Sequence, residues 1–486
     1  MRRVTIDPIT RLEGHGKIDL FLDAEGDVAE AYFQVPELRG FESFCVGRLA
    51  EEMPVITNRI CGVCPEAHHM ASVKAFDVTP PPAALKIREL VYATFFVADH
   101  TTHFYALGGP DLIVGPDAPA AERNLLGVVR KAGLELGRQV IATRARCHQV
   151  IERLGGRGIH PAAGLPGGWS KAVTEAVRVE VEAAARANVA FALTTLELFR
   201  GLVLDDPTWR AELGSDLYHH RTYYMGTVDP AGRVNFYDGT IRVIDPDGRE
   251  LLRFPARDYA QHVAERTEPW SYLKFPYLRA IGWRGFVDGV ESGVYCATPL
   301  ARLNVATGMA TPLAQQHFER FFAFFGGRPV HHRLATHWAR LVELLYAAER
   351  MLELATDPEI TSPEVRVLPA GGARPGPAVG SVEAPRGTLL HRYEADARGV
   401  LTHVDLVVGT THNHAPIAMS IKRAAERLIR GGRIEPGLLN RIEMAFRLYD
   451  PCLSCATHAL PGQMPLEVRV RSAAGEVLHT VRRGVP

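Results

Sequence analysis

The chain has 486 residues, with 55 basic and 55 acidic side chains, so its formal net charge at pH 7 is zero. This balance argues against a basic nucleic-acid interface and against a polybasic membrane contact. The length predicts about two to four lobes, and the 47% hydrophobic content predicts large folded cores. Seven unevenly spaced cysteines exclude a disulfide-stapled secreted scaffold.

The N-terminal segment carries charges and Pro8 before any apolar run develops, so no secretory signal is expected. No uninterrupted apolar run reaches the roughly 18 residues that a membrane helix needs, so no membrane span is expected. We therefore expect a cytoplasmic protein. A partner with its own signal could still carry such a chain across a membrane.

Alternating apolar residues predict an N-terminal hairpin over 16–35, and Pro80-Pro81-Pro82 then precedes a helical pattern. The remaining elements are expected, in chain order, as helices at 119–153 and 172–204, a β-rich interval at 226–256, helices at 311–323 and 329–356, a connector at 368–380, a hairpin at 391–408, and helices at 416–430 and 435–447.

These elements predict a mostly helical α+β fold. A central bundle of long helices, over 83–204 and 311–356, would be flanked by small antiparallel sheets. A C-terminal lobe would cover 384–458.

Four of the cysteines form two C-x-x-C pairs, Cys61 with Cys64 and Cys452 with Cys455. Such a pair can bind one metal ion through both sulfurs, and two pairs suit Zn²⁺, an iron–sulfur cluster or a nickel centre. The pairs are 452 − 64 = 388 residues apart, whereas a zinc ribbon separates them by about 15–20. We therefore expect a buried catalytic or electron-carrying centre between lobes. Redox-active or incidental thiols are the alternative.

The residues around these cysteines carry a family resemblance. A series of ordered motifs resembles those of the large subunit of [NiFe] hydrogenases over essentially the whole chain: Arg11-Leu12-Glu13-Gly14-His15, Leu38-Arg39-Gly40-Phe41-Glu42, Asp99-His100-Thr101-Thr102-His103, Ala384-Pro385-Arg386-Gly387, Thr410-Thr411-His412-Asn413, and the two cysteine motifs. Stretches such as Trp270–Tyr277 resemble the soluble, heterodisulfide-reductase-associated, viologen-reducing branch. The deazaflavin-reducing and NAD-reducing branches stay open.

The resemblance implies a binuclear centre. Cys61 and Cys452 would be terminal nickel ligands, while Cys64 and Cys455 would also bridge to an iron that carries CO and cyanide. These diatomic ligands would lie against Pro385, Arg386 and Thr410.

The resemblance also implies roles for nearby polar residues. Glu13 would accept the proton from H₂, Asp99 and Asp450 would flank the Arg386 guanidinium, and His68 would donate to a bridging sulfur. Taken alone, Glu13 would be a solvated side chain, Arg386 a surface arginine and His68 a core residue.

A hard metal ion such as Mg²⁺ is implied as well, bound by Glu42 and His458 and by a main-chain carbonyl within Leu406–Val408. The family removes the segment after this histidine once nickel is inserted, so 459–486 is predicted to be a maturation peptide. A permanent C-terminal hairpin is the alternative.

The predicted function is therefore reversible H₂ oxidation to protons and electrons. The three other cysteines, Cys45, Cys147 and Cys296, are too few for a four-cysteine cluster, so electrons would leave to an iron–sulfur small subunit. Further expected partners are an electron-transfer or heterodisulfide-reductase-type complex, a maturation endopeptidase and nickel chaperones. The alternatives are a metal-free structural or quinone-site subunit of a respiratory complex and a zinc protein.

Overall fold

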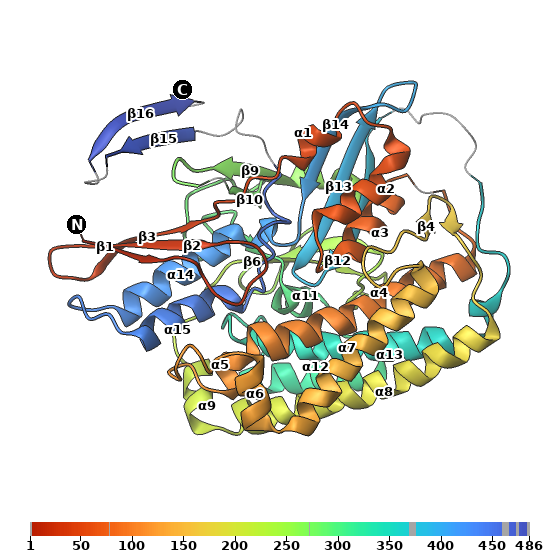
Figure 1. Ribbon diagram of the computed structural model, residues 1–486, viewed down its shortest axis with the longest axis horizontal. Helices are drawn as coiled ribbons and strands as arrows, with labels where there is room; N and C mark the ends of the chain where they lie inside the picture. The colour runs from red at the N-terminus through yellow and green to blue at the C-terminus, as the bar shows by residue number, and fades with distance from the viewer. Residues whose placement is uncertain are drawn as a thin grey trace.

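Long helices pack together at the base of the molecule (Figure 1). The computed structural model describes residues 2–76, 78–271, 273–368, 376–458, 466–472 and 476–483. The helices of the bundle are α4 (Pro82–Thr102), α7 (Leu134–Gly155), α8 (Glu175–Phe199), α12 (Pro312–Phe325) and α13 (Ala335–Thr356). Helix α13 is buried along almost its whole length and packs against both α8 and α4, so it is the core of the bundle.

The starts of these helices follow from local sequence. Pro82 and Pro312 occupy the first turns of α4 and α12, where the missing proline N–H costs nothing. At the start of α8 the Thr174 hydroxyl accepts a hydrogen bond from the Val177 N–H. The helices outside the bundle are α1 (Phe41–Cys45), α2 (Met53–Ile56), α3 (Pro65–Ala75), α5 (Gly109–Ile113), α6 (Leu125–Ala132), α9 (Pro207–Leu213), α10 (Tyr259–His262), α11 (Pro299–Val305), α14 (His414–Leu428) and α15 (Pro436–Arg447).

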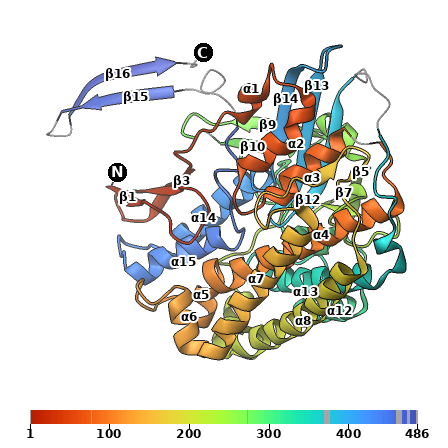
Figure 2. The ribbon, with the colours of Figure 1, turned by 45° about the vertical axis from the view of Figure 1, so that its right-hand side comes forward.

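Small sheets cover one side of the bundle (Figures 1 and 2). Their strands are β1 (Arg2–Ile6), β2 (Lys17–Leu22) and β3 (Val28–Gln34); β4 (Gly164–Leu165) and β5 (Gly168–Trp169); β6 (Tyr223–Val228), β7 (Thr240–Ile244), β8 (Glu250–Phe254) and β11 (Tyr295–Cys296); β9 (Val263–Thr267) and β10 (Lys274–Leu278); β12 (Ala378–Ala384), β13 (Gly387–Ala395) and β14 (Leu401–Val407). All neighbouring strands in these sheets are antiparallel except β11 and β6, which are parallel.

The structure confirms the predicted fold class, a helical bundle flanked by small sheets. Two local predictions were wrong in detail. The expected helix over 119–153 is two helices, α6 and α7, because Gly133 adopts a φ of 99° between them. The expected connector over 368–380 overlaps strand β12, which begins at Ala378, while 369–375 lie outside the described residues.

Strand β12 could not be predicted from its own sequence because tertiary packing decides its conformation. It pairs with β13 along its whole length and lies against helix α3. A Cβ at Gly380 would come within 1.9 Å of the Ala71 carbonyl oxygen, so the close contact between strand and helix requires glycine here.

Helix α8, continued by a π-helical segment to Leu204, is long and apolar enough by composition to cross a membrane. It packs against α13 and α7 inside the bundle, and 44% of its apolar window is buried there. A bundle helix passes the same length and composition test.

Strands β15 (Leu466–Arg471) and β16 (Val477–Arg483) form a hairpin that stands apart from the rest of the chain in both views (Figures 1 and 2). Residues 459–465, the first of the predicted maturation peptide, lie outside the described residues. The predicted boundary at His458 stays a prediction.

Candidate metal centre

The four cysteines of the two C-x-x-C pairs meet at one buried point. Cys61 follows a 3-10 turn and Cys64 begins helix α3, while Cys452 and Cys455 lie just after helix α15. The four sulfur atoms lie within 4.8 Å of one another. The Cys61–Cys452 and Cys64–Cys455 sulfur distances are 3.4 and 3.5 Å. Two loops from opposite ends of the chain therefore build one site.

Burial makes this site unfavourable for four free thiolates. Burial raises the pKa of Cys452 and of Cys455 well above the ordinary thiol value. Hydrogen bonds with the Cys452, Cys455 and Cys64 thiols instead lower the pKa of Cys61. The Val63 and Cys64 N–H groups also donate to the Cys61 sulfur, at 3.1 and 3.3 Å. A bound cation would stabilise all four thiolates together.

The donor set fits a soft transition metal. Among the residues that the structure describes, these four cysteines form the one group of three or more histidine, cysteine or carboxylate side chains close enough to share a metal ion. Cys45, Cys147 and Cys296 are buried elsewhere as free thiols. Four sulfur ligands suit nickel, iron or zinc.

Glu13 lies directly beside this cluster. Its Oε2 atom is 2.9 Å from the Cys452 sulfur and accepts a hydrogen bond from the Ser454 N–H at 3.2 Å, while Oε1 contacts the Ser454 hydroxyl. The Glu13 carbonyl also accepts a hydrogen bond from the Leu453 N–H at 3.0 Å. The backbone and the side chain together hold this carboxylate against the sulfur. Ser454 was not anticipated, although its place between the two cysteines offered a signal.

Arg386 occupies the tight turn between β12 and β13, and its guanidinium is buried. Its Nη1 atom lies 3.0 Å from Asp99 Oδ2 and its Nη2 atom 3.1 Å from Asp450 Oδ2. Burial raises the pKa of both carboxyls, an effect that the guanidinium opposes. Although burial works against a charged arginine, the two carboxylates raise the pKa of Arg386 well above its ordinary value, so the arginine stays charged.

Gly387 makes the Arg386 turn possible. Its φ is 147°, and a Cβ there would come within 2.6 Å of the Ala297 carbonyl oxygen and 2.7 Å of the Gly409 carbonyl oxygen. The Asn413 side-chain amide donates to the Arg386 and Gly409 carbonyls, at 2.7 and 3.0 Å. The turn is therefore fixed on both sides.

A buried arginine that sequence reasoning missed also holds this turn. The Arg302 guanidinium donates to the carbonyl oxygens of Ala384 and Pro385, at 2.9 and 3.1 Å. Glu343, fully buried like Arg302, accepts from the Arg302 Nε at 2.6 Å. A buried arginine and a buried glutamate on two apolar helices are the signal that could have found them.

The remaining predicted residues lie around the cluster. The Thr410 hydroxyl accepts a hydrogen bond from the Cys452 N–H at 3.0 Å. His68 Nδ1 faces His391 Nε2 at 3.1 Å, its Nε2 has no hydrogen-bond partner among the described residues, and burial lowers its pKa to about 4. The structure records no hydrogen bond from His68 to a cysteine within the described chain.

The two predicted ligands of a hard metal ion come from helix α1 and from the segment after Cys455, which contact each other. The His458 ring lies against Phe41, the neighbour of Glu42, with 5.7 Å between ring centroids. His458 is buried, and neither ring nitrogen makes a hydrogen bond in the described part of the chain. Glu42 accepts from the Leu406 N–H at 3.1 Å and lies 3.6 Å from the Lys274 ammonium. An unpaired buried imidazole beside a carboxylate fits a metal ligand.

A small cavity adjoins the cysteine loop, and a second cavity adjoins the first. One, of about 110 Å³, is lined by Val63, Glu66, Asp99 and other residues, and the second, of about 280 Å³, shares Thr102 and His148 with it. The volume of the first cavity admits a very small molecule beside the Cys61–Cys64 loop.

Comparison with known proteins agrees with this arrangement. A family model described as nickel-dependent hydrogenase matches residues 39–124 and 264–458, and a HoxL-like model matches 3–38. The chain therefore belongs to the nickel-dependent hydrogenase family. It is the large, catalytic subunit of a [NiFe] hydrogenase, an oxidoreductase with a nickel–iron centre at its four clustered cysteines.

Three relatives indicate its place within the family. The chain is 49% identical to an F420-non-reducing hydrogenase iron-sulfur subunit of Archaeoglobus profundus, over 99% of this chain and 100% of the relative. It is 38% identical to the NAD-reducing hydrogenase HoxS subunit beta of Cupriavidus necator, over 98% and 99%. A crystal structure of an H₂-reduced NAD⁺-reducing [NiFe]-hydrogenase superimposes with a TM-score of 0.88 at 38% identity, covering 94% and 100%.

Proposed function

We propose that the cysteine cluster binds nickel and iron as the resemblance implies. Cys61 and Cys452 would be terminal nickel ligands, and Cys64 and Cys455 would bridge to an iron that carries CO and cyanide. When bound, this centre would supply the metal pair that polarises and splits H₂. The meeting of four buried sulfur atoms within 4.8 Å carries the proposal.

Glu13 would move the proton that H₂ cleavage releases. Oxidation of one H₂ yields two protons and two electrons, so a base must remove protons from the site. The Glu13 Oε2 atom, 2.9 Å from the Cys452 sulfur, is within reach of a proton on that sulfur. Ser454 keeps the carboxylate in this orientation through its N–H and hydroxyl.

Arg386, Thr410 and Pro385 would line the pocket of the diatomic iron ligands. The guanidinium and hydroxyl can donate hydrogen bonds to cyanide, and Asp99 and Asp450 keep the guanidinium in place. His68, neutral because burial lowers its pKa to about 4, would stay beside the sulfurs as a hydrogen-bond donor. The small cavity beside the Cys61–Cys64 loop suits H₂ as the substrate.

Electrons would leave to an iron–sulfur small subunit. All seven cysteines of the chain are accounted for, four in the centre and three buried singly, so an electron acceptor must come from a partner. The side chains of Phe44, Val55 and Val63 are exposed near the Cys61–Cys64 loop and suit a protein interface. Such a partner would complete the enzyme.

The relatives named F420-non-reducing favour an acceptor other than the deazaflavin. We infer a viologen-reducing enzyme that passes electrons to a heterodisulfide-reductase-type complex. The NAD-reducing relative keeps a nicotinamide acceptor open. A cytoplasmic site of action stays a prediction.

Assembly of the centre would depend on nickel chaperones and on an endopeptidase that cuts after His458. Glu42, His458 and a carbonyl within Leu406–Val408 would bind Mg²⁺. The C-terminal loop would then be held by the nickel–iron centre through Cys452 and Cys455 and by Mg²⁺ through His458.

Metal analysis and infrared spectroscopy of the purified complex test this function. One nickel and one iron per chain, with absorption bands of iron-bound CO and cyanide, are expected together with H₂-dependent viologen reduction. Zinc alone would identify a four-thiolate zinc protein. A chain without metal would identify a structural or quinone-site subunit of a respiratory complex.

A further inference from the structure

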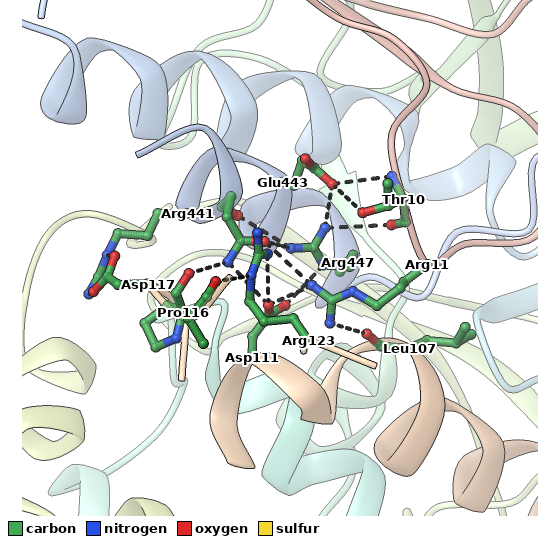
Figure 3. A network of polar contacts seen from close by, with 12 residues as sticks. Thr10, Arg11, Leu107, Asp111, Pro116, Asp117, Arg123, Arg441, Glu443 and Arg447 are labelled. Carbon is green, nitrogen blue, oxygen red and sulfur yellow. Dashed lines mark hydrogen bonds and ion pairs between the residues drawn. The ribbon is translucent and has the colours of Figure 1, made fainter. Parts of the chain in front are cut away.

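A second buried ionic cluster lies at the junction of the N-terminal loop, helix α15 and the bundle, with the Asp111 carboxylate at its centre (Figure 3). The Arg11 guanidinium donates to Asp111 Oδ1 at 2.5 Å, and the Arg447 Nε donates to Oδ2 at 3.0 Å. Arg123 pairs with Oδ1 at 3.7 Å, and the Asn440 amide donates to it at 3.2 Å. One carboxylate therefore accepts hydrogen bonds from three side chains and forms an ion pair with a fourth.

The two arginines that share Asp111 belong to the two segments that form the Glu13–Cys452 pair. Arg11 is two residues before Glu13, and Arg447 is five residues before Cys452. Asp111 itself belongs to α5, next to the end of α4 in the bundle. The carboxylate thus ties both active-site segments to the same rigid support.

Further contacts join the two segments to each other. Glu443 accepts from the Thr10 N–H and hydroxyl, at 3.2 and 2.9 Å, and also pairs with Arg447 at 2.5 Å. Arg11 donates through its other Nη to the Leu107 carbonyl oxygen at 2.9 Å. This arrangement holds Arg11 at a φ of 58°, which a residue with a Cβ rarely adopts.

We propose that Asp111 is a positioning residue for proton transfer, which fixes the Glu13 carboxylate against the Cys452 sulfur through Arg11 and Arg447. This inference rests on the proposed role of Glu13. A proton-accepting group works only within hydrogen-bond reach, so a small displacement of either segment would slow proton removal.

The ionisation state of Asp111 supports this role in addition to the contacts of its side chain. Burial alone would raise the pKa of this carboxyl, but the Arg447 and Arg11 guanidiniums outweigh burial and lower the pKa. The carboxylate therefore stays ionised in a dry site. Replacing it with an amide would leave its arginine neighbours without their shared anion while keeping the side-chain volume.

The test compares Asp111→Asn with Asp117→Asn in the full nickel-loaded complex. Asp117 is the matched control because it belongs to the same region, is mostly exposed and pairs with Arg441 rather than with Arg11 or Arg447. In this complex we measure turnover per bound nickel and its solvent deuterium isotope effect. In the nickel-free chain we measure amide hydrogen exchange of residues 10–15 and 450–455.

For Asp111→Asn we expect turnover per nickel to fall about 10- to 100-fold, a larger solvent isotope effect, and faster exchange in both segments. Asp117→Asn should match the unaltered enzyme in all three. Lower nickel content with unchanged turnover per nickel and an unchanged isotope effect would show a merely structural role and overturn the inference.

Two further variants keep the result decisive. If Asp111→Asn does not accumulate, Arg11→Lys replaces it in the test. This variant retains the charge but cannot reach both Leu107 and Asp111, so it should lower turnover per nickel in the same way. Unchanged turnover of Arg11→Lys would overturn the inference. Glu13→Gln separates the two proposals. If Glu13→Gln keeps full turnover, the role of Glu13 fails; if only Glu13→Gln lowers it, the positioning inference alone fails.

Discussion

The Glu13 carboxylate lies 2.9 Å from the Cys452 sulfur, although the two residues are 439 positions apart in the chain. A parallel backbone bridge between the same two residues and the hydrogen bonds of Ser454 maintain this contact. The proposed base and the sulfur of the proposed metal ligand are therefore held in register by the backbone, which is the geometry that proton removal requires.

Glu13→Gln should lower H₂-dependent viologen reduction by about 10²- to 10⁴-fold, because the amide cannot accept the proton. Nickel and iron contents should stay at the level of the unaltered enzyme, since Glu13 is not a predicted ligand. Glu37→Gln is the control, because Glu37 lies in a neighbouring loop and pairs with His15. Full activity of Glu13→Gln would refute the role.

Arg386→Met should destabilise the chain by about 3–5 kcal/mol, because it leaves the buried Asp99 and Asp450 carboxyls without their shared cation. Denaturant unfolding measures the change, with the exposed Arg398→Met as control. Adding Asp450→Asn to Arg386→Met should recover part of the loss. A double variant less stable than Arg386→Met would contradict this explanation.

Acid should destabilise the chain through its buried histidines. Burial lowers the pKa of His69 to about 4, and of His337 and His412 to about 3. The unfolded imidazoles bind protons below about pH 6.5. The contribution of the neutral buried histidines to stability is therefore fully present above that pH. It should fall by roughly 1.4 kcal/mol per pH unit per histidine as the pH drops toward the folded pKa values.

Urea unfolding at several pH values between 7.5 and 4.5 measures this dependence. Burial raises the pKa of Glu66 to about 8 and so acts in the opposite direction, but buried histidines outnumber such carboxyls. His412→Gln should reduce the slope by the contribution of one histidine. A stability that does not change over this range would contradict the prediction.

Intact-mass measurement of active enzyme should show a chain that ends at His458. The hairpin of β15 and β16 pairs only with itself among the described strands, so its removal would break no sheet of the main body. Nickel-free protein should keep the full length. An active, nickel-loaded chain of 486 residues would show that the tail is permanent.

Metal analysis of Glu42→Gln should show loss of magnesium, because a neutral amide is a weaker ligand for a hard cation. Glu30→Gln is the control, since Glu30 lies on β3 and pairs with Lys422. Unaltered enzyme that contains no magnesium would instead indicate that the Lys274 ammonium and the Leu406 N–H satisfy Glu42.

Local sequence was enough to predict the long helices, because the apolar period of helices such as α8 and α13 needs no partner to be recognised. It also identified both cysteine pairs, since ligand type and the two-residue spacing are local properties. Strand β12 and the break at Gly133 were missed. The conformation of β12 depends on its pairing with β13, and the break depends on the positive φ of Gly133; the pattern of apolar residues reveals neither.

The sequence by itself thus predicted the metal ligands, carried the family motifs and indicated an electron-accepting partner. Tertiary structure alone decided which side chains meet: Arg302 under the Pro385 turn, Ser454 against Glu13, and Asp111 between Arg11 and Arg447. Spacing along the chain does not reveal which side chains meet when the segments are 83 to 441 residues apart. Buried charges make such contacts specific, because each requires a partner wherever packing places it.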